Sequence, residues 1–192
     1  MKKLLVIGSV FILTTLVVLG VAGWLLTKPM SWYAPSAESD PEISILANKA
    51  ESRLNEEFHK IRPQDETWNL RIQDYALNAW LSTRLEGWLT HDETLEIPPE
   101  FSNPFIKTTS SGIWAACMVQ FDEKKQPVAI QFHPSVTNEG QFMLTPIAIR
   151  LGRIPLPISL FGEMAEDLQQ HIAGVKAVIE LMDDRKVIIQ SI

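Results

Sequence analysis

The first pattern along the chain is an unbroken apolar run near the N-terminus. No charged residue occurs between Leu4 and Leu26. In a helix, roughly 23 residues extend about 35 Å, enough to cross a hydrocarbon core of about 30 Å. The few hydroxyl side chains in the run can bond back to the helix backbone, so their cost in lipid is modest. The pattern predicts a transmembrane signal-anchor over residues 1–27.

Charge predicts how this segment is oriented. Lys2 and Lys3 precede it, and acidic residues outnumber basic ones in the stretch that follows. The positive-inside rule then places the N-terminus in the cytoplasm and the rest of the chain outside it, in the periplasm or the extracellular space. We expect Trp24, Trp32 and Tyr33 to form an aromatic belt at the outer interface.

A cleaved signal peptide is the alternative to an anchor. Its apolar core is normally about 7–15 residues long, which is shorter than this run. Val21-Ala22-Gly23 fits a cleavage site, but cleavage there would leave Trp24-Leu25-Leu26 at the new terminus. An uncleaved single-pass anchor in a cell membrane is therefore favoured.

The next pattern predicts a linker and two helices. Residues 28–39 contain helix-breaking prolines and are typical of a juxtamembrane linker. Asp40-Pro41 is a helix start, and apolar residues then recur at spacings of three and four as far as Arg62-Pro63. Trp68 to Ile72 alternates like a short strand. Asp74 is the expected cap of a second helix that reaches Leu89, and residues 91–104 are expected to form a loop.

Three β-type runs follow, at Ser111–Phe121, Pro127–Val136 and Gln141–Leu151. Gly152 is expected at a backbone position closed to other residues, and Pro155 and Pro157 should end the strand. Helical spacing resumes from Ile158 to about His171. Residues 174–192 fit either a hairpin or a helix followed by a strand, and their alternation favours the hairpin.

Together these elements predict an α+β fold on an N-terminal transmembrane helix. We expect residues 40–192 to form a single extracytoplasmic domain, in which a curved antiparallel sheet grips one or two helices. About 160 residues after the anchor are enough for one domain with a proper core.

Composition excludes one class of partner. The formal net charge is −6 and the basic residues are scattered, whereas nucleic acid binding needs a basic face. The single cysteine, Cys117, lies in an apolar run, which is typical of a buried thiol acting as a small hydrophobe.

The residues that carry chemistry form no recognisable pattern. The four histidines are not spaced as metal ligands. Glu56 and His59 lie three apart on a helix, a spacing that a carboxylate-bridged metal site would use twice, and only one copy occurs. A solvated helix face is the better interpretation. We therefore predict no catalytic residue, no metal, no cofactor and no enzymatic activity.

One feature goes beyond an ordinary core. The predicted strands and the second helix carry more large apolar side chains than a small domain usually has. Such a set is most often plain core. The alternative is a sheet curled round a helix with a dry groove for a lipid chain, lined by Trp80, Leu81, Leu85, Trp114, Phe132 and Phe142.

Two short motifs resemble a known family. Leu70 to Leu81 is similar to a "strand, acidic cap, x-x-Leu-Asn-x-Trp-Leu" opening, and Ile147 to Pro157 to an "apolar alternation, Gly, basic, Ile-Pro-Leu-Pro" ending. Both resemble the YpmS-like family of single-pass bacterial membrane proteins. More distantly they are similar to TULIP-type lipid-binding domains, in which a curved antiparallel sheet wraps a helix. The resemblance implies a fold and carries no catalytic residue.

The expected function is non-enzymatic binding at the outer face of the cytoplasmic membrane, with a lipid or acyl chain as the ligand. The alternative is a scaffold or assembly subunit that binds another membrane or envelope protein and has no ligand pocket.

Overall fold

A computed structural model of the protein describes residues 2–36, 40–63, 66–90, 98–162, 177–181 and 185–189, with the side chains of 2–10, 161 and 180 excepted. The helices are α1 (Lys2–Thr27), α2 (Pro41–His59), α3 (Asp74–Thr83) and α4 (Leu85–Leu89). The strands are β1 (Phe101–Thr109), β2 (Gly112–Phe121), β3 (Lys124–Val136), β4 (Phe142–Leu151), β5 (Ile154–Leu156), β6 (Val178–Glu180) and β7 (Lys186–Ile188). A 3-10 turn, η1 (Ile158–Phe161), follows β5.

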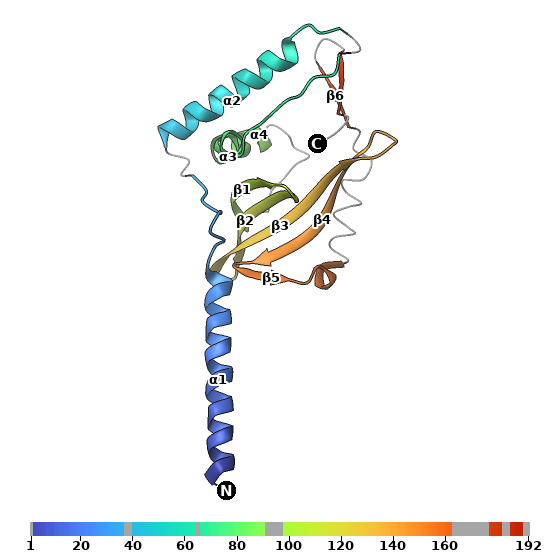
Figure 1. Ribbon diagram of the computed structural model, residues 1–192. Helices are drawn as coiled ribbons and strands as arrows, with labels where there is room; N and C mark the ends of the chain where they lie inside the picture. Colours follow the sequence, from blue (N-terminus) through green and yellow to red (C-terminus); the bar gives the residue numbers. More distant parts are fainter. Residues whose placement is uncertain are drawn as a thin grey trace.

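Strands β1 to β5 form one antiparallel sheet in chain order, and β6 and β7 form a separate antiparallel pair (Figure 1). The three β-type runs of the sequence correspond to β2, β3 and β4. The hairpin favoured for the C-terminal residues is confirmed by the pairing of β6 with β7. Helices α2, α3 and α4 lie on one side of the sheet in Figure 1, so the α+β prediction is confirmed.

Helix α2 begins as the sequence predicts. Asp40 is its N-cap, and the carboxylate accepts a hydrogen bond of 2.9 Å from the amide of Glu42. Pro41 occupies the first turn, where its missing N–H costs nothing. The helix ends at His59, and Pro63 disfavours helical geometry at Arg62, so the helix could not extend past that point.

The second predicted helix is divided and begins differently. Arg84, with φ −123°, separates α3 from α4. The prediction that Asp74 is the N-cap is wrong: Gln73 holds that position, and Asp74 is the first helical residue. The carboxylate of Asp74 is instead bonded to β1.

Two strand assignments are also corrected. Residues 68–72 form no strand, and the predicted loop at 91–104 overlaps β1, which begins at Phe101. The alternation of β1 is broken at Asn103-Pro104, where the register with β2 shifts and Asn103 adopts φ 54°. A left-handed residue followed by a proline reads in sequence as a turn, and here it is a β-bulge.

Part of the predicted linker belongs to the core. Met30 and Tyr33 are 3% and 7% exposed, and they form a buried cluster with Trp114, Ala116 and Ala129 of the sheet. The placement of Trp32 and Tyr33 in an interfacial aromatic belt is therefore wrong. Their rings pack on the sheet, with the Trp32 centroid 5.8 Å from that of Trp114. The folded unit thus includes residues N-terminal to Asp40.

The C-terminal end is described in part. Residues 158–161 form the 3-10 turn η1, and the predicted helix beyond residue 162 lies outside the described residues. The β6–β7 pair is held to the tip of the β3–β4 hairpin by a 2.8 Å hydrogen bond from the amide of Ala177 to the carbonyl oxygen of Gly140.

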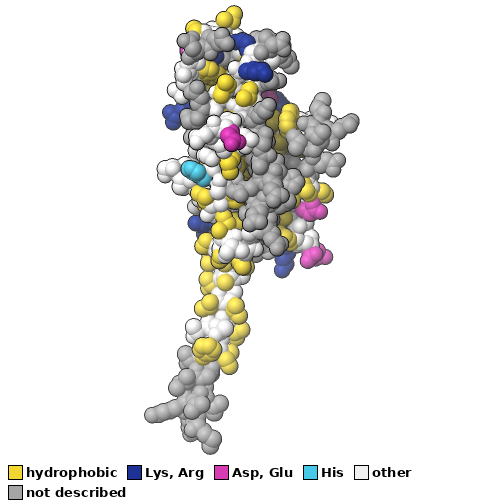
Figure 2. Space-filling model, turned by 90° about the vertical axis from the view of Figure 1, so that its right-hand side faces the viewer, with side chains coloured by type: hydrophobic (Ala, Val, Ile, Leu, Met, Phe, Trp, Pro, Cys, Tyr) yellow, Lys and Arg dark blue, Asp and Glu magenta, His cyan; other side chains and the backbone are white. Residues whose placement is uncertain are grey.

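Helix α1 projects from the end of the sheet (Figure 1), and Figure 2 shows hydrophobic side chains along the part of it whose side chains are described. The side chains of α1 are described from Phe11 onward. Among the described residues, no helix is long and apolar enough to cross a membrane.

Candidate functional site

The six residues predicted to line a lipid groove do not share one surface. Trp114 is opposite Gln131 in the β2–β3 register, and Phe132 is the next residue of β3. Because successive side chains of a strand point to opposite faces, Trp114 and Phe132 lie on opposite faces of the sheet. Phe142 is opposite Val136, which shares the face of Phe132.

We call the face that carries Trp114 the linker face, because residues 30–33 cover it. The Trp32 ring packs at a tilt against the rings of both Trp114 and Phe105 there, with centroids 5.8 Å and 6.2 Å apart. The Tyr33 hydroxyl donates a 2.8 Å hydrogen bond to the carbonyl oxygen of Asn103, in the bulge of β1. Burial raises the pKa of Tyr33. The ring of Trp114 is therefore covered by side chains of residues 30–33.

The remaining three predicted residues lie on α3 and α4, at the edge of the sheet. Trp80 faces α2: its indole Nε1 donates a 2.9 Å hydrogen bond to Glu51, and its ring meets Trp88 edge-on at 6.3 Å. Leu81 and Leu85 are partly buried. Helix α3 thus packs between α2 and β1, and Trp80 belongs to the helix–helix contact.

Two polar side chains of α3 form hydrogen bonds with the edge strand β1, and the sequence did not predict this role. The Asn78 side chain, 6% exposed, donates to the carbonyl oxygen of Ile106 at 2.8 Å and accepts from its amide at 2.7 Å. One turn earlier, Asp74 accepts hydrogen bonds from the amide and the hydroxyl of Thr108, at 3.1 Å and 2.6 Å. The i, i+4 spacing matches alternate residues of the edge strand, so α3 takes the place of a further strand.

The carboxylate of Asp74 also pairs with Lys107 at 3.1 Å. Burial by itself would raise the pKa of Asp74. The hydrogen bonds from Thr108 and the charge of Lys107 outweigh that effect and hold the pKa below its usual range. The edge is therefore covered by an ionised carboxylate, which also discourages pairing with another chain.

The junction of α1 with the sheet is closed by backbone contacts. Gly152, in the β4–β5 turn, has φ +59°, and a Cβ there would lie 2.2 Å from the carbonyl oxygen of Leu26. This confirms the prediction that the position is closed to other residues. The amide of the next residue, Arg153, donates a 3.0 Å hydrogen bond to the carbonyl of Leu25, and its Nε donates to Pro29 at 3.0 Å. The turn caps the end of α1.

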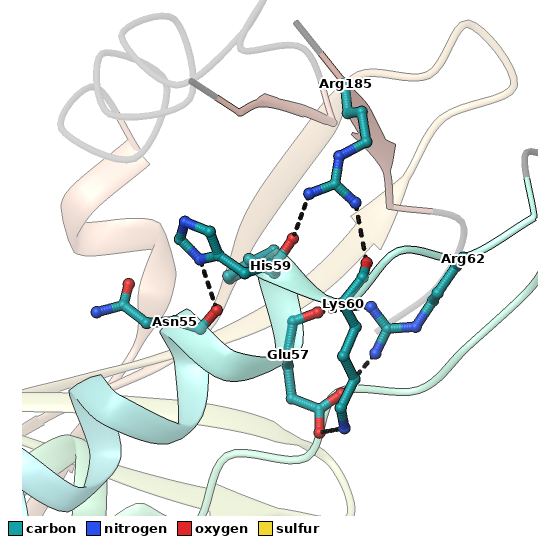
Figure 3. Close-up of polar contacts among 7 residues, drawn as sticks. Asn55, Glu57, His59, Lys60, Arg62 and Arg185 are labelled. Atoms are coloured by element: carbon teal, nitrogen blue, oxygen red, sulfur yellow. Dashed lines mark hydrogen bonds and ion pairs between the residues drawn. The ribbon is translucent and has the colours of Figure 1, made fainter. Parts of the chain in front are cut away.

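A second cap lies at the C-terminal end of α2 (Figure 3). Arg185, just before β7, donates to the carbonyl oxygens of Lys60 and Phe58 at 2.9 Å and 3.1 Å. Beside it, Glu57 binds Lys60 and Arg62, and the hydrogen bond from Lys60 is the main reason that the pKa of Glu57 is lowered. The hydrogen bonds of Arg185 join the C-terminal pair of strands to α2.

No chemical centre emerges from the described residues. An open depression of about 500 Å³ runs along the outer side of α2, and its lining contains none of the six predicted groove residues. Within the ranges that the structure describes, no group of three or more His, Cys, Asp or Glu side chains could hold a metal ion. Glu56 and His59 are both exposed, and burial raises the pKa of the Cys117 thiol.

Comparisons with protein-family models, with curated proteins and with solved structures found no match, so the resemblance to the YpmS-like family stays a prediction.

Proposed function

We propose that this chain is a membrane-anchored, non-enzymatic scaffold at the outer face of a bacterial cytoplasmic membrane, where its domain binds another membrane or envelope protein. The observation that carries the anchor is the exposed apolar surface of α1 from Phe11 onward. Its large apolar side chains from Phe11 to Trp24 are 51% to 73% exposed. Exposed apolar surface of this extent is unfavourable in water at about 25 cal/mol per Å², and a bilayer removes that cost.

The proposed span, Leu4 to Leu26, includes residues that precede the described side chains, and for these the support is their uncharged sequence. The orientation follows from Lys2 and Lys3. A reporter enzyme that is active only outside the cytoplasm should work when it is fused after Ile192. Activity of a cytoplasm-only reporter at the same point would overturn the orientation.

The same fusion distinguishes an anchor from a signal peptide. We expect the mature protein to retain its N-terminal residues and to resist extraction from membranes by alkaline carbonate. Mature protein that lacks residues 1–23 would show a cleaved signal, and the anchor would then be withdrawn.

A scaffold is favoured over a lipid carrier because the residues expected to line one groove lie on two faces of the sheet and on α3 and α4. Trp114 is covered by Trp32, and Trp80 is engaged with α2. The test is native mass spectrometry of the domain from Lys28 to Ile192, with lipid extraction of the same sample. A stoichiometric lipid would favour the lipid carrier. A lipid-free domain that photo-crosslinks to one membrane protein in cells supports the scaffold.

A further inference from the structure

The segment from Arg153 to Leu160 borders the point where α1 leaves the domain. Strand β5 contacts α1, and β5 and η1 form the lower border of the domain in Figure 1, level with the end of α1. The rod and this border meet at the Arg153 bonds to Leu25 and Pro29. The height of the segment above any membrane is therefore fixed by the position of α1.

The composition of this border differs from that of the chain as a whole. From Gly152 to Gly162 there is one charged residue, Arg153, and no acidic one, although the chain carries a net charge of −6. Pro155, Pro157, Ser159 and Leu160 are exposed, and Leu160 is 70% exposed. An apolar border with a single cation suits the interface between lipid headgroups and acyl chains, where apolar side chains insert and arginine meets phosphate.

The backbone of β5 also suits a position at a membrane surface. β5 pairs with β4 on one side only, and Pro155 lies opposite Arg150 in that pairing. A proline offers no N–H, so it reduces the unpaired donors at an edge strand. Such an edge avoids pairing with other strands while it lies against a polar, hydrated headgroup layer.

We propose that residues 153–160, the β5–η1 border, rest on the surface of the bilayer that holds α1, with Leu160 inserted below the headgroups and Arg153 at the phosphate level. The proposal depends on the anchor described above. In this arrangement the domain is seated on the membrane, and α2, at the opposite end, faces away from it.

The test uses the full chain with Cys117→Ala as background and one cysteine added at Leu160, Ser159 or Ile61. Ile61, 94% exposed after the end of α2, is the control for the distant end. Each variant is labelled with a small fluorophore and reconstituted into vesicles of phosphatidylcholine and phosphatidylglycerol. Quenching by a lipid with a spin label at its headgroup is then compared with quenching by aqueous iodide.

We expect the labels at 159 and 160 to be quenched by the spin-labelled lipid and shielded from iodide, and the label at 61 to show the reverse. If all three labels respond to iodide alone while the chain resists carbonate extraction, the seating is overturned and the anchor stands. If carbonate removes the chain from the vesicles, both are overturned. Ser159 is polar and exposed, so its variant remains informative where Leu160→Cys disturbs folding.

Discussion

The side-chain amide of Asn78 makes both hydrogen bonds with Ile106 that a neighbouring strand would make, donating to its carbonyl oxygen at 2.8 Å and accepting from its amide at 2.7 Å. Ile106 lies in β1, at the edge of the sheet. An edge residue with unpaired backbone groups would be a site of aggregation. Asn78 removes that liability from the interior of a helix, where asparagine is otherwise a weak choice.

Replacement of Asn78 should therefore cost more than its size suggests. Asn78→Ala leaves the amide and the carbonyl of Ile106 unpaired in a buried setting. We expect the free energy of unfolding to fall by about 2–4 kcal/mol, since an unsatisfied buried group costs about 1–3 kcal/mol. Urea unfolding of residues 28–192 measures it. Asn69→Ala, at an exposed position, is the control, and an equal effect at both sites would contradict this role.

The closed junction gives the second prediction. Gly152→Ala should destabilise the chain both through its left-handed backbone and through collision with the carbonyls of Leu25 and Leu26. Gly140→Ala has a similar φ of +72° but open space, so it isolates the backbone strain of about 1–3 kcal/mol.

In the full chain, Gly152→Ala should lower the melting temperature more than Gly140→Ala. In a chain that begins at Lys28, the carbonyls at 25 and 26 are gone, and the two substitutions should become alike. A Gly152→Ala effect that is unchanged by the truncation would mean that the contact with α1 contributes nothing.

The corrected boundary of the folded unit gives the third prediction. A chain that begins at Asp40 lacks Met30, Trp32 and Tyr33, which cover the linker face. Loss of one large buried side chain costs about 2–5 kcal/mol, and a domain has only about 5–15 kcal/mol in total. We expect residues 28–192 to unfold cooperatively and residues 40–192 to fail to do so, as measured by denaturant titration. Equal stability of the two would restore the boundary at Asp40.

Alkaline pH should weaken the same core. The unfolded pKa of a tyrosine is about 10, and the folded pKa of Tyr33 is raised by burial. Above pH 10 the unfolded chain binds fewer protons than the folded one, so stability is present below pH 10 and falls as pH rises beyond it. Tyr33→Phe should flatten this fall in the free energy of unfolding between pH 9 and 11. An unchanged fall in the Tyr33→Phe variant would contradict this role of Tyr33.

Sequence patterns were sufficient for elements whose signals are local. The cap at Asp40, the hydrophobic alternation of β2 to β4, and the left-handed backbone of Gly152 in its turn depend on a residue and its neighbours along the chain. The failures involve distant partners. In the sequence alone, Tyr33 fits an interfacial aromatic residue, but its hydroxyl donates a hydrogen bond to Asn103. Asp74 fits a helix cap, but its carboxylate accepts a hydrogen bond from Thr108.

The six residues of the groove hypothesis do not share one surface, for a related reason. Register decides which side of a sheet each side chain faces, and a shift of one residue reverses it. The sequence shows that Trp114 and Phe132 are large and apolar, but their placement on opposite faces depends on the pairing of Trp114 with Gln131. No pattern within either strand contains that information.

The caps on α1 and α2 also determine when the chain can fold. The hydroxyl of Tyr33 donates a hydrogen bond to a residue 70 positions later in the chain. The carbonyl oxygens of Pro29 and Lys60 accept hydrogen bonds from arginines 124 and 125 positions later. Contacts of such long sequence separation form slowly. The elements that are synthesised first must therefore wait for those synthesised last. A polypeptide that stays open until Arg185 has been synthesised could cross a membrane unfolded and complete its folding on the far side, as the proposed location of the domain requires.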